Sequence, residues 1–191
     1  MNLAQQFQTS ERPARMVGLF TMRALRPSEL ERLVGACLGA MKEEEPGASL
    51  TLTPLGDPPP ALELQRTWRV TVKDGETAAP HDCLVQVFLM DDPGSPHKEM
   101  LEHLHGMDDE LGRQGEEAAQ NALTYLTVAS GRLDDAARVH PYLNLVSLFS
   151  SALGAYIVDA AAAIVSKDPG EWADACEMSL QLEKEMGLLR R

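Results

Sequence analysis

The longest apolar run of the chain, from Leu143 to Val165, limits the fold more than any other feature of the sequence. A membrane-spanning helix needs about twenty consecutive apolar residues. Asn144, Gly154 and Asp159 interrupt this run, and three serines lie between Asn144 and Gly154. We therefore expect no membrane span. The run predicts a buried helix with Gly154 as its left-handed C-terminal residue, and then a strand or hairpin, because β-branched and aromatic residues follow the glycine.

Hydrophobic periodicity assigns the rest of the chain to the α+β class. Expected strands cover residues 16–25, 49–56, 64–75 and 82–92, and expected helices cover 27–45, 97–110, 116–130, 134–153 and 171–191, with a possible break at Pro141. The coarse order is β-α-β-β-β-α-α-β-α, in which the three helical stretches between residues 97 and 153 are counted as two elements. It predicts a single antiparallel or mixed sheet with helices packed mainly on one face. We expect residues 1–15 to form a flexible N-terminal arm and residues 16–191 to form a single α+β domain.

The tryptophans and cysteines all lie in apolar patterns. We expect Trp68 and Trp172 to be buried, and Cys37, Cys83 and Cys176 to be packed, unreactive thiols. A sparse, odd set of cysteines without CxxC spacing is typical of a reducing compartment. The first residues, MNLAQQFQTSERPAR, do not resemble a signal peptide. The expected localisation is cytoplasmic.

The charge of the chain restricts its partners. Lysine and arginine number 17 and aspartate and glutamate 29, so the net charge is −12. Such a chain repels phosphate backbones and anionic membranes. We therefore expect no nucleic-acid partner and no membrane partner. The charge favours a basic protein partner, and a homodimer is left open.

The stretch HKEMLEHLHGMDDE, residues 97–110, is the one candidate metal site. Histidines and carboxylates at helical spacing can bind zinc or another divalent ion. The candidate ligands are His103, His105, Glu99, Glu102 and Asp109, with His97 beside them. The stretch lacks HExxH spacing, and Gly106 weakens the helix that would hold the ligands. A solvent-exposed acidic helix face is the interpretation that the pattern favours.

Other catalytic patterns are missing from the sequence. It contains no GxSxG motif and no glycine-rich loop of phosphate-binding form. Asp134 and Asp135 are expected to cap a helix N-terminus. His140 precedes Pro141 and could line a cleft, but it stands alone. We expect no catalytic residues and no cofactor.

The segment ALGAYIVDAAAAIVSKDPGEW and the order of elements resemble the bacterial DUF4261 domain. In that family a helix ends in a short apolar strand, and a Glu-Trp type pair begins the next helix. Residues 154–158 and the pair Glu171 and Trp172 take those places here, and His81 is the nearest counterpart of a histidine-bearing strand. The resemblance extends in outline over residues 16–180. It implies an α+β fold, and the family has no assigned activity.

Two functions from different classes follow from these patterns. The first is a cytoplasmic domain that acts through protein-protein contacts, like an immunity protein, a chaperone or an adaptor. Its support is the acidic surface and nine methionines, which can form an adaptable apolar patch. The alternative is a metal-dependent hydrolase that uses the cluster at residues 97–109.

Overall fold

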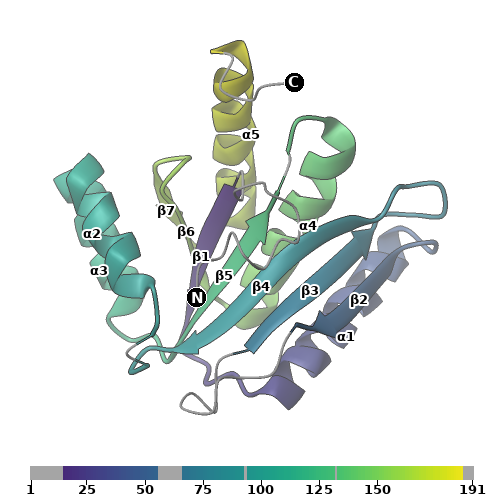
Figure 1. The fold of residues 1–191 in the computed structure, drawn as a ribbon, viewed down its shortest axis with the longest axis horizontal. Helices are drawn as coiled ribbons and strands as arrows, with labels where there is room; N and C mark the ends of the chain where they lie inside the picture. The colour runs from purple at the N-terminus through teal and green to yellow at the C-terminus, as the bar shows by residue number, and fades with distance from the viewer. Residues whose placement is uncertain (1–14, 56–65, 93, 132, 187–191) are drawn as a thin grey trace.

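The computed structural model describes residues 15–55, 66–92, 94–131 and 133–186 (Figure 1). The strands are β1 (Arg15–Thr21), β2 (Ser49–Pro54), β3 (Arg66–Lys73), β4 (His81–Leu89), β5 (Thr124–Ser130), β6 (Tyr156–Asp159) and β7 (Ile164–Ser166). The helices are α1 (Pro27–Glu44), α2 (His97–Met107), α3 (Asp109–Ala119), α4 (Ala136–Leu153) and α5 (Pro169–Glu185). The strands form one sheet in the order β2-β3-β4-β5-β1-β6-β7, and every neighbouring pair is antiparallel.

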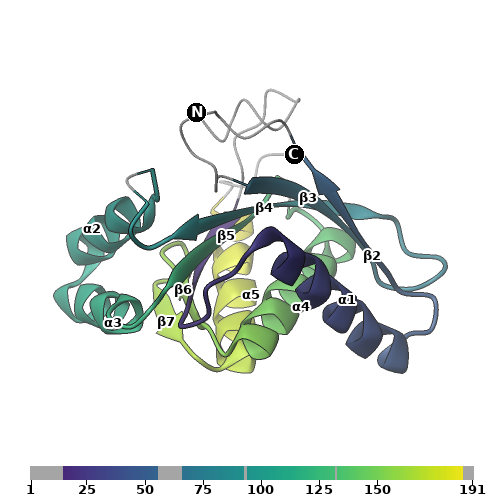
Figure 2. The same cartoon turned by 90° about the horizontal axis from the view of Figure 1, so that it is seen from below.

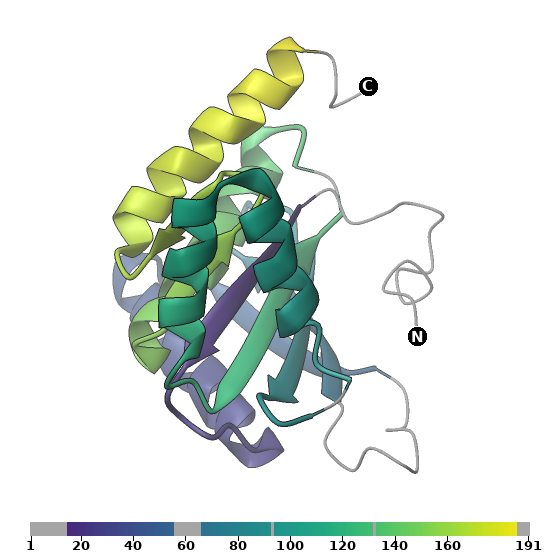
Figure 3. The same ribbon diagram turned by 90° about the vertical axis from the view of Figure 1, so that its left-hand side faces the viewer.

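Helices cover the two faces of the sheet unequally. Helices α1, α4 and α5 lie together on one face (Figure 2), whereas the α2–α3 pair packs on the opposite face near β1 and β6 (Figure 3). Alternate residues of a strand point to opposite faces. Val17 and Leu19 of β1 accordingly join the larger core under α1, α4 and α5. Phe20 joins a smaller core with Leu104 of α2. The predicted α+β class, with one sheet and helices mainly on one face, is confirmed.

The long apolar run folds as its glycine predicts. Helix α4 ends at Leu153, and Gly154 has a left-handed φ of 58°. The backbone N–H of Ala155 donates to the carbonyl oxygen of Ser150 at 3.0 Å, which closes the helix end. The chain then enters the β6–β7 hairpin, so the predicted change from helix to strand is confirmed. Pro141 lies within α4 and does not break it. None of the described helices combines the length and apolar character that crossing a bilayer requires.

The predicted helix at residues 116–130 is wrong over most of its length. Helix α3 ends at Ala119, and Thr124–Ser130 form β5 in the middle of the sheet. All seven residues of β5 are buried. A strand covered on both faces shows no alternation of polar and apolar residues, so periodicity could not identify it. The local signal is instead the set of strand-forming residues Tyr125, Thr127 and Val128.

A buried ion pair joins the first described residue to the end of β6. The expected arm lies outside the described residues except for Arg15, which is the first residue of β1. Arg15 Nη2 lies 3.1 Å from Asp159 Oδ2, and both side chains are fully buried. Trp172 Nε1 donates to the same oxygen at 3.0 Å, and Arg15 Nη1 also reaches Glu183 at 3.2 Å. These contacts connect β1, β6 and α5.

Candidate functional site

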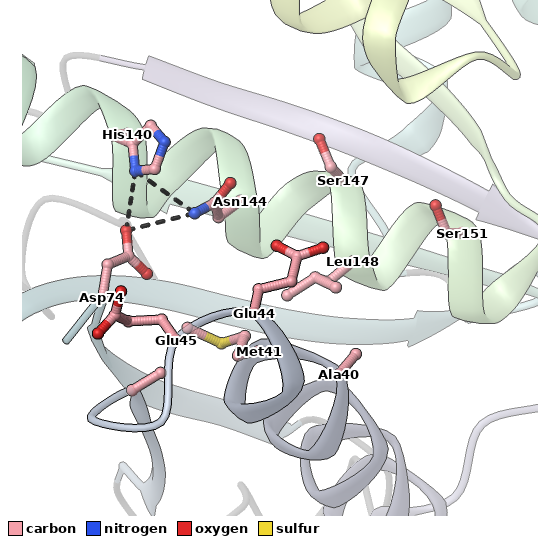
Figure 4. Close-up of a pocket in the computed structure, with 11 residues that line it drawn as sticks. Ala40, Met41, Glu44, Glu45, Asp74, His140, Asn144, Ser147, Leu148 and Ser151 are labelled. Atoms are coloured by element: carbon pink, nitrogen blue, oxygen red, sulfur yellow. Dashed lines mark hydrogen bonds and ion pairs between the residues drawn. The ribbon is translucent and has the colours of Figure 1, made fainter.

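A groove of about 430 Å³ opens between α1, α4 and the turn that follows β3 (Figure 4). We call it the α1–α4 groove. Glu44 and Glu45 line it from the end of α1, and Asp74 from the turn. His140 and Asn144 line it from α4. Figure 4 shows the side chains of Asp74, His140 and Asn144 pointing toward one another.

One oxygen of Asp74 holds this arrangement together. Asp74 Oδ2 lies 3.1 Å from His140 Nδ1 and 3.3 Å from Asn144 Nδ2. A carboxylate oxygen can only accept, so His140 Nδ1 carries the hydrogen and donates it. The other oxygen, Oδ1, is buried and has no hydrogen-bond partner among the described residues. The Asp74 side chain is 15% exposed and the His140 side chain 69%.

Local sequence explains why these groups meet. His140 and Asn144 are four residues apart on α4 and therefore share one face. Gly75 has a φ of +120°, which an L side chain rarely adopts, and it turns the chain directly after Asp74. A Cβ added to Gly75 would lie 3.3 Å from the carboxylate of Glu45. The turn after β3 thus packs against the end of α1 and places two carboxylates side by side.

The charge of the groove suits a cation. Three carboxylates line it, and no lysine or arginine occurs among the described residues of its wall. Met41 and Leu148 add apolar surface. Lysine and arginine side chains combine an apolar stem with a charged head. The groove therefore matches such a side chain in both charge and polarity.

The His140–Asp74 pair also has the orientation of a general base and its positioning carboxylate. Nucleophilic catalysis needs a hydroxyl or thiol within hydrogen-bond distance of the histidine. Within the described residues, no serine, threonine or cysteine side chain hydrogen-bonds to His140. Ser147 lies two turns further along α4. Among the described residues, the hydrogen-bond partners of His140 are a carboxylate and an amide.

The structure does not bring the candidate metal ligands of residues 97–110 together. His97 is buried and bonds to Ser95 Oγ at 2.9 Å, and His105 Nε2 lies 3.0 Å from Glu116 Oε1. The exposed members are Glu99, Glu102, His103, His105 and Asp109. In the described part of the chain, no three His, Cys, Asp or Glu side chains gather so that they could hold a metal ion.

The predicted burial of the thiols is confirmed. Cys37, Cys83 and Cys176 are buried and unpaired. Burial raises the pKa of Cys37 to about 11 and that of Cys176 to about 12, and it raises the pKa of Cys83 further. These thiols are therefore protonated near neutral pH and poorly nucleophilic.

Two further predictions concern tryptophans and a helix cap; the first is confirmed, and the second is confirmed for Asp135 but not for Asp134. Trp68 and Trp172 are buried. Asp135 caps α4 by accepting from the backbone N–H of Arg138 at 3.0 Å. Asp134 instead pairs with the Arg138 side chain at 2.9 Å. None of these residues lines the α1–α4 groove.

Sequence reasoning found only one member of the groove. It named His140 as a lone histidine, and it missed the residues that surround it, which are Glu44, Glu45, Asp74 and Asn144. The i,i+4 spacing of His140 and Asn144 is a signal that the sequence does carry. Nothing in the sequence indicates that Asp74, which lies 66 residues before His140, meets them.

Comparison of the chain with family models, with curated proteins and with solved structures finds no match. The resemblance to the DUF4261 domain stays a prediction from element order and the segment around Gly154. Arguments about function therefore depend on the geometry and charge of the chain itself.

Proposed function

We propose that this chain is a non-enzymatic, cytoplasmic binding domain of the immunity, chaperone or adaptor kind. Its α1–α4 groove accepts a lysine or arginine side chain of a basic protein partner. The observation that carries the proposal is the buried Asp74 Oδ1, which has no hydrogen-bond partner among the described residues. A buried acceptor without a donor costs free energy, and a cationic donor from a partner removes that cost.

The surrounding charge supports the same partner. Glu44 and Glu45 are exposed beside Asp74, so a cation reaches the groove through a negative potential. The net charge of −12 adds a long-range attraction for basic proteins and a repulsion for nucleic acid. Three buried, unpaired cysteines fit a reducing compartment.

Helix α5 offers a second contact surface, which also combines apolar side chains with carboxylates. Met178, Leu182 and Met186 are 51–65% exposed along one side of it. Exposed Glu177 and Glu185 lie beside this stripe. A second copy of the chain would bring like charges together, so the stripe favours a basic partner over a homodimer.

The alternative, a metal-dependent hydrolase built on residues 97–109, has no specific contact in its favour. It stays a prediction from spacing.

Binding of a fluorescein-labelled hexa-arginine peptide tests the proposal. We expect saturable binding at low salt that Asp74→Asn weakens about tenfold, because a hydrogen bond to a charged group contributes about 1.5–3 kcal/mol. Fluorescence anisotropy measures the affinity, and thermal unfolding establishes that the variant is folded.

The matched control is Glu31→Gln near the start of α1, which removes one exposed negative charge outside the groove. We expect less than a twofold change for it, since exposed charge pairs contribute little. Equal losses for the two variants would mean that the peptide responds to net charge alone, and the proposed role of the groove would be abandoned.

A further inference from the structure

A second cavity lies on the opposite face of the sheet, beside α2. Its volume is about 520 Å³, and sites for small molecules generally occupy about 300–1,000 Å³. Its lining comes from α2, β1, β5 and the turn between β6 and β7. We call it the α2 pocket. It shares no lining residue with the α1–α4 groove.

Methionine side chains form much of the wall of the α2 pocket. Met16 comes from β1, and Met100 and Met107 come from α2. Methionine is unbranched and polarizable, so it adapts to ligands of varied shape. Met107 is 45% exposed at the outer end of α2. The wall can therefore adjust around an apolar ligand.

The hydroxyl of Tyr125 is directed toward this pocket. Tyr125 lies opposite Phe20 in the β1–β5 pair. A Cβ added to Gly18 would lie 2.6 Å from Tyr125 Oη, so the ring extends from Phe20 over Gly18 toward Met16. Met16 and Tyr125 both line the pocket. The ring thus leans along β1 toward the cavity, and only glycine at position 18 leaves room for it.

This hydroxyl has no hydrogen-bond partner among the described residues, although Tyr125 is fully buried. Burial raises the pKa of Tyr125, so the hydroxyl keeps its hydrogen and can donate it. A buried hydroxyl without a partner is unfavourable. A ligand oxygen that accepts from it would remove that cost.

The rim of the pocket restricts the charge of a ligand. Glu99 and His103 of α2 are both exposed and both line it. The carboxylate of Glu99 and the acidic surface of the whole chain disfavour an anion. The small side chains Ala160 and Ala161 line the side formed by the β6–β7 turn and leave space there.

We propose that the α2 pocket binds a small uncharged organic molecule with an apolar body and one hydrogen-bond-accepting oxygen, which accepts from Tyr125. Shape and apolar contact supply most of the affinity, and the hydroxyl supplies orientation. The inference is independent of the proposed function, because the groove and the pocket lie on opposite faces of the sheet.

The test uses the full chain, the neutral dye N-phenyl-1-naphthylamine and a matched pair of competitors. We expect saturable dye fluorescence, and we expect 2-acetylnaphthalene to displace the dye at about tenfold lower concentration than 2-ethylnaphthalene, which lacks the oxygen. Tyr125→Phe should retain dye binding and make the two competitors equal. Equal displacement from the native protein, or a preference that survives in Tyr125→Phe, would overturn the role of the hydroxyl.

Ala161→Leu tests the location of the dye. Ala161 is exposed at the edge of the pocket, so a larger side chain should fill the cavity and reduce dye affinity at least about tenfold. Ala137→Leu, at an exposed position of α4 outside the pocket, is the matched control and should leave it unchanged. Dye binding that is absent from the native protein, or equal in the two variants, would overturn the proposal.

Discussion

Two aspartates of the chain each pair with a basic side chain, in the pairs Arg15–Asp159 and His140–Asp74. The two carboxylates differ in burial and in how many of their hydrogen bonds are made. Asp159 is fully buried, and its oxygens accept from Arg15, from Trp172 Nε1 and from the backbone N–H of Ala162. Asp74 lies at the wall of a groove, and one of its oxygens has no partner among the described residues. A carboxylate with all its hydrogen bonds made stabilises the fold, whereas one with an acceptor left over can still bind a ligand.

The largest expected effect is on the buried pair. Asp159→Asn leaves the Arg15 charge buried with Glu183 as its one acidic partner among the described residues. Breaking a buried ion pair generally costs about 3–5 kcal/mol. Asp74→Asn should cost about 1 kcal/mol or less, because its partner His140 is exposed. Urea unfolding of both variants measures the difference. If the two costs are equal, the distinction between a structural and a binding carboxylate fails.

The next effect concerns the turn that positions Asp74. Gly75→Ala places a Cβ where φ is +120° and where the Glu45 carboxylate lies 3.3 Å away. We expect a loss of about 1–2 kcal/mol in the free energy of unfolding and weaker binding of hexa-arginine. Gly39→Ala, within α1 and with nothing near its added Cβ, should instead stabilise by about 0.5–1 kcal/mol. A neutral Gly75→Ala would mean that the turn does not fix the groove.

The sequence predicts features that depend on local patterns, and it does not predict contacts between distant elements. Helices α1, α4 and α5 have clear patterns, and Gly154 marks its helix end because only a left-handed residue closes that end well. Strand β5 was missed because both its faces are buried. Neither Asp74 nor the charged pair of Arg15 and Asp159 could be predicted as such, since each contact joins elements distant in sequence and depends on how the sheet is ordered.

Acid should weaken the fold through His81, which is buried and bonds to Ser130 Oγ at 2.9 Å. Burial, and then the nearby charge of Arg138, lower the pKa of His81, and the carboxylates of Asp82, Asp135 and Asp74 oppose this. The unfolded state therefore binds the proton first. Stability is complete above the unfolded pKa of about 6.5 and is lost as pH falls from there toward the folded pKa.

Urea unfolding between pH 7.5 and about 5 checks this expectation. His81→Asn should flatten the decline in part, because the pKa of His97 is lowered by burial as well and contributes in the same direction. A decline that His81→Asn does not change would remove His81 as its cause.

The smallest effect on stability is expected for His140→Ala, and it is the most informative about the groove. The ring is 69% exposed, so its loss should change the free energy of unfolding by no more than about 0.5 kcal/mol. Removing the ring frees Asp74 Oδ2 from one donor and leaves Asn144 in place. The carboxylate then has more acceptor capacity for a cation, and the affinity for hexa-arginine should rise about twofold, on the scale of one exposed pair. Asp74→Asn in the same assay should lower it. If His140→Ala instead weakens binding as strongly as Asp74→Asn does, the ring itself contacts the peptide, and the groove recognises its ligand through the histidine and the carboxylate together.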